Sequence, residues 1–310
     1  DDVESRGLGD VYKRQLIDLD KFGISTTEWE AYVEKTKDDL RQGNISANGI
    51  TIYLYLYDLM TGKKGQRDIR YVFIDEVQDY DAYQLAYLKF RFPNARFTLL
   101  GDLNQAIFTH ENSRSLLRQL GTMFDPEKTK VVQLTKSYRS TKQITDFTKH
   151  FLTNGEAIEA FDRNGDLPTV IETDSYSTGV DSVVETLKKY QQEHDAVAII
   201  GKTLNDCEKL YDELKRRNVK TTLIRTENQR LVDGVIIVPS FLAKGLEFDA
   251  VIAWNVNEQE YPDDSERQLL YTIASRAMHA LTMISVGKVT PLLKGVPDDL
   301  YSLVKRGKNN

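Results

Sequence analysis

From residue 70 onward, short apolar runs alternate with longer stretches in which apolar residues recur at three- and four-residue spacing. The short runs predict β-strands and the longer stretches predict amphipathic helices. Strands and helices that alternate in this way form a parallel sheet with crossover helices, so the sequence predicts an α/β fold. The predicted strands are 71–75, 97–101, 131–134, 168–171, 197–200, 221–224, 235–238, 250–254 and 281–286. The predicted helices are 82–90, 113–120, 141–152, 180–192, 205–217 and 265–278.

Composition limits the class of protein. The 310 residues are 40% hydrophobic and 28% charged, which is enough for two ordinary globular domains. The sequence has no run of 18 apolar residues and no signal-peptide pattern at its start, so we expect a soluble, cytoplasmic protein with no membrane partner. Cys207 is the only cysteine, which excludes a disulfide framework within this sequence. His110, His150, His194 and His279 lack ligand spacing, so we expect no structural zinc.

The formal net charge of −6 bears on the choice of partner. Proteins that hold nucleic acid mainly by neutralising phosphates usually carry a basic excess on the binding domain. A protein that moves along a single strand can instead use a local basic groove and base stacking. The acidic charge therefore weakens a nucleic-acid interpretation without excluding it, and leaves room for a protein partner.

The chain is expected to have three parts. Residues 1–15 show no sustained apolar periodicity, so we expect a non-native or disordered start. Residues 16–68 are predicted to be mostly helical, with a helix start near Thr27 and a buried segment at 50–60. The stretch 154–166 is rich in turn-forming residues and is the predicted linker, although the boundary lies as early as Lys136 in an alternative assignment. The predicted domains are 16–137, with its helical lead-in, and 138–310.

Two adjacent carboxylates, Asp75 and Glu76, follow the apolar strand 71–75. The carboxyl ends of strands in open α/β sheets are where ligands bind. Asp75 in this position suits Mg²⁺ held through coordinated waters, and Glu76 suits a group that orients or deprotonates a water attacking a phosphate. A strand that simply ends in a solvated acidic loop is an equally good explanation of these two residues alone.

Five segments in a fixed order resemble conserved motifs of the UvrD/Rep-type superfamily 1 helicases. They follow the family's order with workable spacing from about residue 70 to 287, which makes coincidence a poor explanation. The segments are Asp75-Glu76-Val77-Gln78-Asp79 (motif II), residues 99–108 (motif III), 134–141 (motif IV), 241–249 (motif V) and 266–277 (motif VI).

The resemblance implies a fold, ligands and residue roles. The fold is two RecA-like parallel-sheet domains of the P-loop NTPase type, the first incomplete, with ATP and Mg²⁺ bound between them. Asp75 would hold Mg²⁺ and Glu76 would activate water. Gln105 would sense the γ-phosphate, and Phe108 would stack on a base of the DNA strand. Without its motif, Phe108 is as well explained as a core residue.

Motifs IV to VI imply the remaining site residues. Tyr138 would stack on adenine and Arg139 would reach the γ-phosphate, while Ser140 also fits a helix cap. Lys244 and Gly245 would lie where the backbone meets nucleic-acid phosphates, with Gly245 permitting close approach. Glu247 would approach the sugar or terminal phosphate of the nucleotide. Arg276 would be the arginine finger on helix 265–278; taken alone, an arginine on an amphipathic helix is nearly always a solvated surface charge.

The sequence departs from the family pattern in two ways. No segment matches Gly-x-x-x-x-Gly-Lys-Ser/Thr; the turn Gly62-Lys63-Lys64-Gly65 does not, so the isolated chain is expected to be inactive. In addition, only about thirty residues separate the predicted strand 197–200 from motif V, which leaves no room for the accessory domain of unwinding family members. This compact spacing is most similar to the DNA helicase IV-like branch, some members of which remodel RNA polymerase.

The resulting functional hypothesis is a fragment of an ATP-dependent DNA helicase or translocase. Its partner would be single-stranded or partly duplex DNA, along which ATP hydrolysis drives movement. One alternative is a helicase-like ATPase that remodels or recycles RNA polymerase, which the acidic charge favours mildly. A second alternative, which follows from the missing P-loop, is a non-enzymatic regulatory or binding remnant.

Overall fold

The computed structural model describes residues 25–45, 47–63, 65–101, 120–121, 123–132, 136–152, 155, 158–227 and 234–307. The segment 1–15 and nearly all of the predicted helix 113–120 lie outside these residues. The described residues divide into two compact units. One unit is formed from the described parts of Asp1–Val72 and Ala82–Arg96, and the other from those of Phe73–Asp81 and Phe97–Asn310. The predicted domain boundary after residue 137 stays a prediction.

The first unit is built from helices, as predicted for this part of the chain. They are α2 (Thr26–Arg41), α3 (Ala47–Met60) and α4 (Ala82–Arg91). Ser25 and Glu28 form a capping box that fixes the start of α2, close to the predicted start near Thr27. Helices α3 and α4 pack together through the ring of Tyr55, whose centroid lies 5.0 Å from that of Phe90. Asp58 is buried at the same contact and accepts a hydrogen bond from Arg91 over 3.2 Å.

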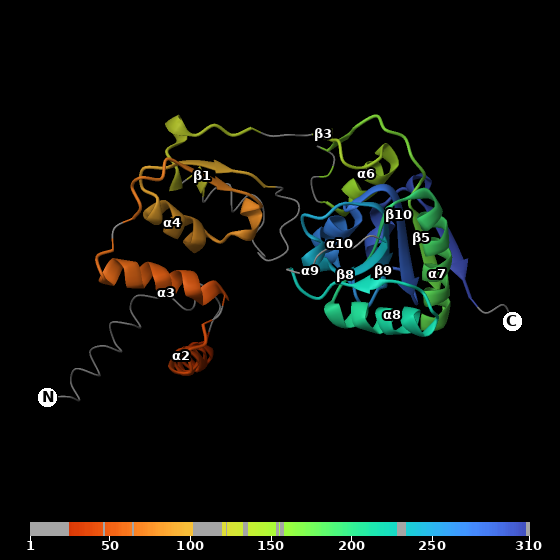
Figure 1. Ribbon diagram of the computed structural model, residues 1–310, viewed down its shortest axis with the longest axis horizontal. Helices are drawn as coiled ribbons and strands as arrows, with labels where there is room; N and C mark the ends of the chain where they lie inside the picture. The colour runs from red at the N-terminus through yellow and green to blue at the C-terminus, as the bar shows by residue number, and fades with distance from the viewer. Residues whose placement is uncertain are drawn as a thin grey trace. The chain divides into compact units, whose positions relative to one another are not determined.

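The prediction of a buried segment at 50–60 is wrong. Most large apolar side chains of α3 are exposed, and Met60 is 87% exposed. The reason is that α3 is apolar on nearly every side, while among the described residues only the side facing α4 is covered (Figure 1). The exposed side chains are Ile50, Ile52, Tyr53, Leu54, Leu56, Tyr57, Leu59 and Met60.

Strands β1 (Tyr71–Ile74) and β2 (Arg96–Leu99) form a two-stranded sheet. Both were predicted within two residues. The end of β1 and the residues after it belong to the second unit. The strand predicted at 131–134 is not formed at Val131 and Val132, and residues 133–135 lie outside the described part.

A seven-stranded sheet dominates the second unit, with the strand order β11-β5-β10-β9-β6-β8-β7. Every neighbouring pair is parallel, so the predicted α/β class is confirmed. The strands are β5 (Thr169–Thr173), β6 (Ala196–Gly201), β7 (Thr222–Leu223), β8 (Gly234–Pro239), β9 (Phe248–Trp254), β10 (Ala277–Val286) and β11 (Ser302–Arg306). The helices are α6 (Lys142–Thr148), α7 (Tyr176–Glu193), α8 (Leu204–Arg216), α9 (Ser240–Ala243) and α10 (Arg267–Ala274).

Alternate residues of the central strands face opposite sides of this sheet and build two cores. In β6, Ala198 and Ile200 face one core, while Val197 and Ile199 face the other. Helices α6, α9 and α10 cover the first side, and α7 and α8 cover the second. Because both faces are covered, the strands are nearly continuous apolar runs, which is why the sequence revealed them.

Shorter elements complete the second unit. β3 (Lys136–Ser137) pairs in parallel with β4 (Glu159–Ala160), which was not predicted. The remaining short helices, which have 3-10 geometry, are η2 (Val77–Asp79), η3 (Pro126–Lys128), η4 (Lys149–Phe151), η6 (Asp264–Glu266), η7 (Pro291–Gly295) and η8 (Asp298–Leu300). Within the described ranges, no helix has the length and apolar character needed to cross a membrane.

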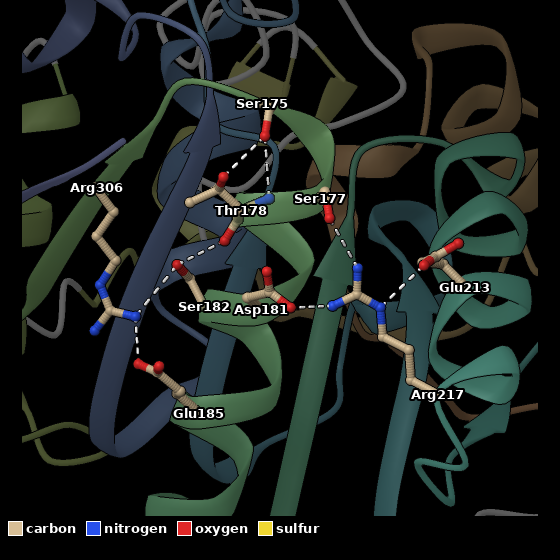
Figure 2. A network of polar contacts seen from close by, with 9 residues as sticks. All are labelled: Ser175, Ser177, Thr178, Asp181, Ser182, Glu185, Glu213, Arg217 and Arg306. Atoms are coloured by element: carbon tan, nitrogen blue, oxygen red, sulfur yellow. Dashed lines mark hydrogen bonds and ion pairs between the residues drawn. The ribbon is translucent and has the colours of Figure 1, made fainter. Parts of the chain in front are cut away.

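Arginines tie the helices α7 and α8 and the strand β11 together (Figure 2). Arg217 follows α8, donates to Glu213 over 2.9 Å and to Ser177 over 3.2 Å, and pairs with Asp181 of α7. Arg306 of β11 pairs in the same way with Glu185 of α7. These contacts join α7 to the end of α8 and to β11 on one side of the sheet.

Candidate nucleotide site

The turn after β1 holds the two predicted carboxylates in a strained backbone. Glu76 has φ 52° and ψ 44°, the left-handed conformation that non-glycine residues rarely adopt. The turn is held by a hydrogen bond from the Glu76 amide to the Asp75 carboxylate over 2.8 Å and by one from Val77 N to Leu100 O over 2.9 Å. Such strain persists only where surrounding contacts maintain it, and it clusters at functional sites.

Lys244 lies against this turn. Its side chain is only 8% exposed, and its Nζ atom donates to Asp79 and lies 3.6 Å from Oε2 of Glu76. The amide of Gln78, which is buried, donates to the same Glu76 oxygen. The predicted nucleic-acid contact of Lys244 stays a prediction, because in this arrangement the ammonium group is already paired with carboxylates.

Arg276 lies between α10 and β10. The prediction that it sits on a helix spanning 265–278 is wrong, because α10 ends at Ala274 with Ser275 as its C-cap, and β10 begins at Ala277. The side chain is 1% exposed. Its guanidinium donates to the carbonyls of Thr272 over 3.1 Å and Leu246 over 3.3 Å. Arg276 is therefore fixed by the backbone of motifs V and VI and is not a solvated surface charge.

The electrostatics of Arg276 connect it to the other predicted site residues. The pKa of its guanidinium is lowered from 12.5 to about 10, mainly by burial and next by the positive charge of Arg139. The carboxylates of Glu76 and Glu247 act in the opposite direction. Arg276 is still a cation at neutral pH, and its charge interacts with two predicted catalytic residues and with Glu247.

Arg139 and Glu247 form an ion pair with Nε and Oε1 2.6 Å apart, and about a third of Arg139 and two-fifths of Glu247 are exposed. The hydroxyl of Ser140 donates to the Ala277 carbonyl over 2.6 Å, which fastens motif IV to the start of β10. Ser140 is not the helix cap, since the side chain of Thr141 caps α6. The contact joins residues 137 positions apart in the sequence.

Two further predicted residues have distinct surroundings. Gly245 has φ +77° with open space where a Cβ would lie, so its backbone conformation, rather than crowding, favours glycine there. Tyr138 is 63% exposed, and the centroid of its ring lies 5.0 Å from that of Phe161. The exposed ring is available to stack on a base. Gln105 and Phe108 lie outside the described residues.

Asp75 is the one residue for which the sequence predicts metal binding. In the described part of the chain, no group of three or more His, Cys, Asp or Glu side chains is arranged to hold a metal ion. Asp75 is exposed. A single accessible carboxylate fits Mg²⁺, which usually keeps several waters and binds through one or two carboxylates together with substrate phosphates.

Comparison with known proteins identifies the family. The UvrD/REP helicase N-terminal domain matches residues 17–119, and the UvrD-like helicase C-terminal domain matches residues 234–284. The solved C-terminal domain of a possible DNA helicase from Lactobacillus plantarum WCFS1 is 57% identical, with 54% of this chain and 98% of that domain covered and a TM-score of 0.49. The chain belongs to the UvrD/Rep-type superfamily 1 helicases.

Other relatives of this helicase chain are more distant. The ATP-dependent DNA helicase Rep of Escherichia coli K12 is 28% identical over 148 residues, which are 46% of this chain and 20% of Rep. The chain thus spans about a fifth of the length of that curated relative. Saccharomyces cerevisiae Dbp5, solved with RNA and ADP BeF3, is 14% identical with a TM-score of 0.49, and the match covers 84% of this chain and 64% of Dbp5.

The helicase site contains contacts that sequence reasoning did not find. Phe161 and Arg163 lie in the stretch 154–166, which was predicted to be a linker, yet both touch motif IV. A single sequence offers little signal for them, because neither falls in a recognised motif or in an apolar pattern. The only sequence cue for these two residues is an aromatic residue followed two positions later by an arginine within a polar stretch.

Proposed function

We propose that this chain is part of an ATP-dependent DNA helicase or translocase that couples ATP hydrolysis to movement on single-stranded DNA. The observation that carries the proposal is the convergence of Arg139, Glu247 and Arg276 at the start of β10, with Glu76 in electrostatic reach of Arg276. Family membership supports helicase activity in general. The individual roles of these residues are inferred from their contacts.

Glu76 is the proposed base for hydrolysis. It would orient the attacking water and accept its proton, a role that requires a fixed carboxylate. Its contacts with Gln78 and Lys244 hold the carboxylate in one place. Mg²⁺, when bound, would neutralise charge on the phosphates, and Asp75 is the residue that would hold it through coordinated waters.

The two arginines are the proposed partners of the terminal phosphate. Arg139 and Arg276 repel each other, and this repulsion contributes to the lowered pKa of Arg276. A phosphate between the two guanidiniums would relieve the repulsion, and each planar fork suits phosphate oxygens. Arg276 would stabilise the charge that develops during transfer, an effect worth about 10³ to 10⁵ in rate for arginine fingers.

Lys244 offers a link between the nucleotide and DNA. We infer that a DNA phosphate can attract Lys244 only if the ammonium group leaves Asp79 and Glu76, because the side chain is nearly buried between them. Release of Lys244 would free the Glu76 carboxylate at the same time. DNA binding would thereby affect the proposed base directly. Phe108 would supply base stacking.

The test of the proposal needs a protein that carries this chain behind a P-loop segment. We expect ATP hydrolysis that single-stranded DNA stimulates, together with movement along the strand, measured by displacement of a protein bound at a DNA end. The 310-residue chain alone should show little or no turnover, because no P-loop is present in the sequence. Substantial DNA-stimulated turnover by the chain alone would contradict the expectation that hydrolysis requires a P-loop.

RNA polymerase as the target is the second candidate function. The acidic net charge of −6 favours a protein partner over an extended phosphate-binding surface. The two candidates differ in what stimulates hydrolysis. Stimulation by RNA polymerase in the absence of free DNA, with none by single-stranded DNA, would favour this second function. The reverse result would favour translocation on DNA.

A further inference from the structure

Residues Phe161–Gly165, here called the bracket segment, pack against motif IV. β4 brings the segment into place, because Ala160 is the register partner of Ser137 and the Phe161 amide donates to the Ser137 carbonyl over 3.2 Å. The Arg163 carbonyl accepts from Lys142 N over 2.7 Å, and Gly165 N donates to the Gln143 side chain over 2.8 Å. The bracket segment is thus bonded to the backbone or side chains on both sides of Tyr138 and Arg139.

The fit at Gly165 shows how closely the segment approaches. A Cβ atom at this position would lie 2.6 Å from Cγ2 of Thr141, a distance at which one of the two must move. Thr141 caps α6 and follows Ser140, which is fastened to β10. A side chain at position 165 would therefore displace either the bracket segment or motif IV.

Phe161 supports one side of the Tyr138 ring. The two ring centroids lie 5.0 Å apart with the planes tilted by 41°, an arrangement favourable for aromatic pairs. Tyr138 is 63% and Phe161 45% exposed. A tyrosine on an open surface would sample several rotamers, and contact with Phe161 restricts them while leaving much of the Tyr138 ring open to a base.

Arg163 supports the backbone of Arg139. Its Nη2 atom donates to the Arg139 carbonyl and lies 3.5 Å from the Met278 carbonyl, two residues beyond Arg276. One guanidinium thus joins the two chain segments that carry the proposed phosphate-binding arginines. Its Nε atom is buried and has no hydrogen-bond partner among the described residues, so the Nη2 contacts and the local fit hold the group in place.

We propose that Phe161 and Arg163 are positioning residues of the nucleotide site: Phe161 orients Tyr138 for the adenine base, and Arg163 orients Arg139 for the terminal phosphate. The inference rests on the proposed function, since it assumes that Tyr138 and Arg139 bind ATP. The inference assigns two different roles to two residues of the bracket segment. Loss of Phe161 should affect recognition of the base, and loss of Arg163 should affect recognition of the terminal phosphate.

The test is a ligand-observed NMR titration of the 310-residue chain with ATP, ADP and ribose 5-triphosphate, which lacks the base. Phe161→Ala should weaken ATP and ADP binding by roughly two- to tenfold, the range expected for loss of one aromatic contact. Ribose 5-triphosphate binding should be unchanged. Phe161→Tyr should retain parent affinity, and Leu167→Ala, a control at another 45% exposed residue, should change nothing.

Arg163→Gln should instead reduce the preference for ATP over ADP, as Arg139→Gln should, and leave the ratio of ATP to ribose 5-triphosphate affinity as in the parent. Arg216→Gln is the matched control, with a side chain 73% exposed on α8. A purely structural role would weaken all three ligands equally in the Phe161 and Arg163 variants, and that result would overturn the inference.

The outcomes also separate this inference from the proposed function. If Tyr138→Ala and Arg139→Gln lose affinity while the Phe161 and Arg163 variants bind as the parent does, only the positioning roles fail. If the Tyr138 and Arg139 variants bind all three ligands as the parent does, or if the parent chain binds no ATP at millimolar concentration, the proposed nucleotide site fails and the positioning roles fail with it.

Discussion

Substitution of Arg276 by methionine separates a catalytic role from a structural one. The side chain is 1% exposed and donates to the carbonyls of Thr272 and Leu246. A buried arginine of this kind is commonly a structural anchor, and breaking a buried paired charge typically costs about 3–5 kcal/mol. For Arg276, the cost of burying the charge offsets the gain from its hydrogen bonds, so we expect a smaller change in the free energy of unfolding.

Two opposing contributions set the expected magnitude. Burial lowers the pKa of Arg276 from 12.5 to about 10, which at 1.36 kcal/mol per pKa unit means that the charged form costs about 3 kcal/mol in the folded state. For a base with a lowered pKa this cost is fully present at neutral pH and declines only as pH rises from about 10 toward 12.5. Methionine removes it but leaves the Leu246 carbonyl without this donor, which costs about 1–3 kcal/mol. The Thr272 carbonyl keeps the Ser275 hydroxyl as donor.

The two contributions nearly cancel, so Arg276→Met should leave the free energy of unfolding within about 1.5 kcal/mol of the parent. Urea unfolding followed by the fluorescence of Trp254 measures this change. Trp254 is buried in the seven-stranded sheet, and Trp29→Phe removes the only other tryptophan. Leu270→Ala is the control, since deleting this fully buried side chain should cost about 2–5 kcal/mol.

Hydrolysis should respond very differently. In a protein that carries this chain behind a P-loop segment, Arg276→Met should reduce ATP hydrolysis by at least roughly a hundredfold with a smaller effect on ATP affinity. Arg276→Lys should restore little, because an ammonium group lacks the planar fork. A stability loss of about 3–5 kcal/mol with hydrolysis reduced only in proportion to unfolding would show that Arg276 is a structural anchor.

Three further outcomes follow from the structure. Glu76→Gln should abolish hydrolysis in the P-loop-containing protein while ATP binding persists, because the amide fills the same volume but cannot accept the proton; parent-level turnover would remove Glu76 from this role. Arg217→Met should lower stability by about 1 kcal/mol and Arg216→Met by less, since Arg217 contacts the side chains of Glu213, Asp181 and Ser177 whereas Arg216 pairs with Glu213; equal thermal midpoints would contradict the network. Burial raises the pKa of Cys207 to about 12, so an aromatic disulfide reagent at pH 8 should label the unfolded chain only, and rapid labelling of the native chain would argue against this burial.

The parallel sheet could be predicted because its strands are buried on both faces. The run Val197–Ile200 is apolar at every position, and alternate residues supply two different cores. β11 was missed for the opposite reason. Leu303 is 48% exposed, and the strand is otherwise polar or charged except for Val304, so its pairing with β5 leaves no apolar pattern in the sequence.

The candidate site was predictable in identity but not in geometry. Arg139, Glu247 and Arg276 could be named because each falls in a motif of the family. Their contacts depend on pairing between distant segments, such as the bond from Ser140 to Ala277, which no local pattern encodes. The burial of Arg276 was not predicted, because the sequence pattern placed this residue within helix 265–278, whereas it follows the end of α10.

The partial exposure of α3 has a related explanation. Its composition predicted burial, since nine large apolar side chains recur between Ile50 and Met60. The hydrophobicity of a helix side indicates how favourable its burial would be, but it does not indicate which neighbouring element buries it. In the described part of the chain, α4 covers one side, and the composition of α3 could not show that.

The outer strands of the seven-stranded sheet decide whether this helicase domain can add strands from another polypeptide. A free sheet margin exposes unpaired amide and carbonyl groups and invites pairing with a second molecule. One margin here is β7, which is only two residues long, and the other is β11, which carries Lys305 and Arg306 beside its exposed leucine. The short length of β7 and the positively charged side chains of β11 both disfavour such pairing. Loss of Ser302–Arg306 would uncover β5, whose Val170 and Ile171 are buried, and would turn a protected margin into an aggregation-prone one.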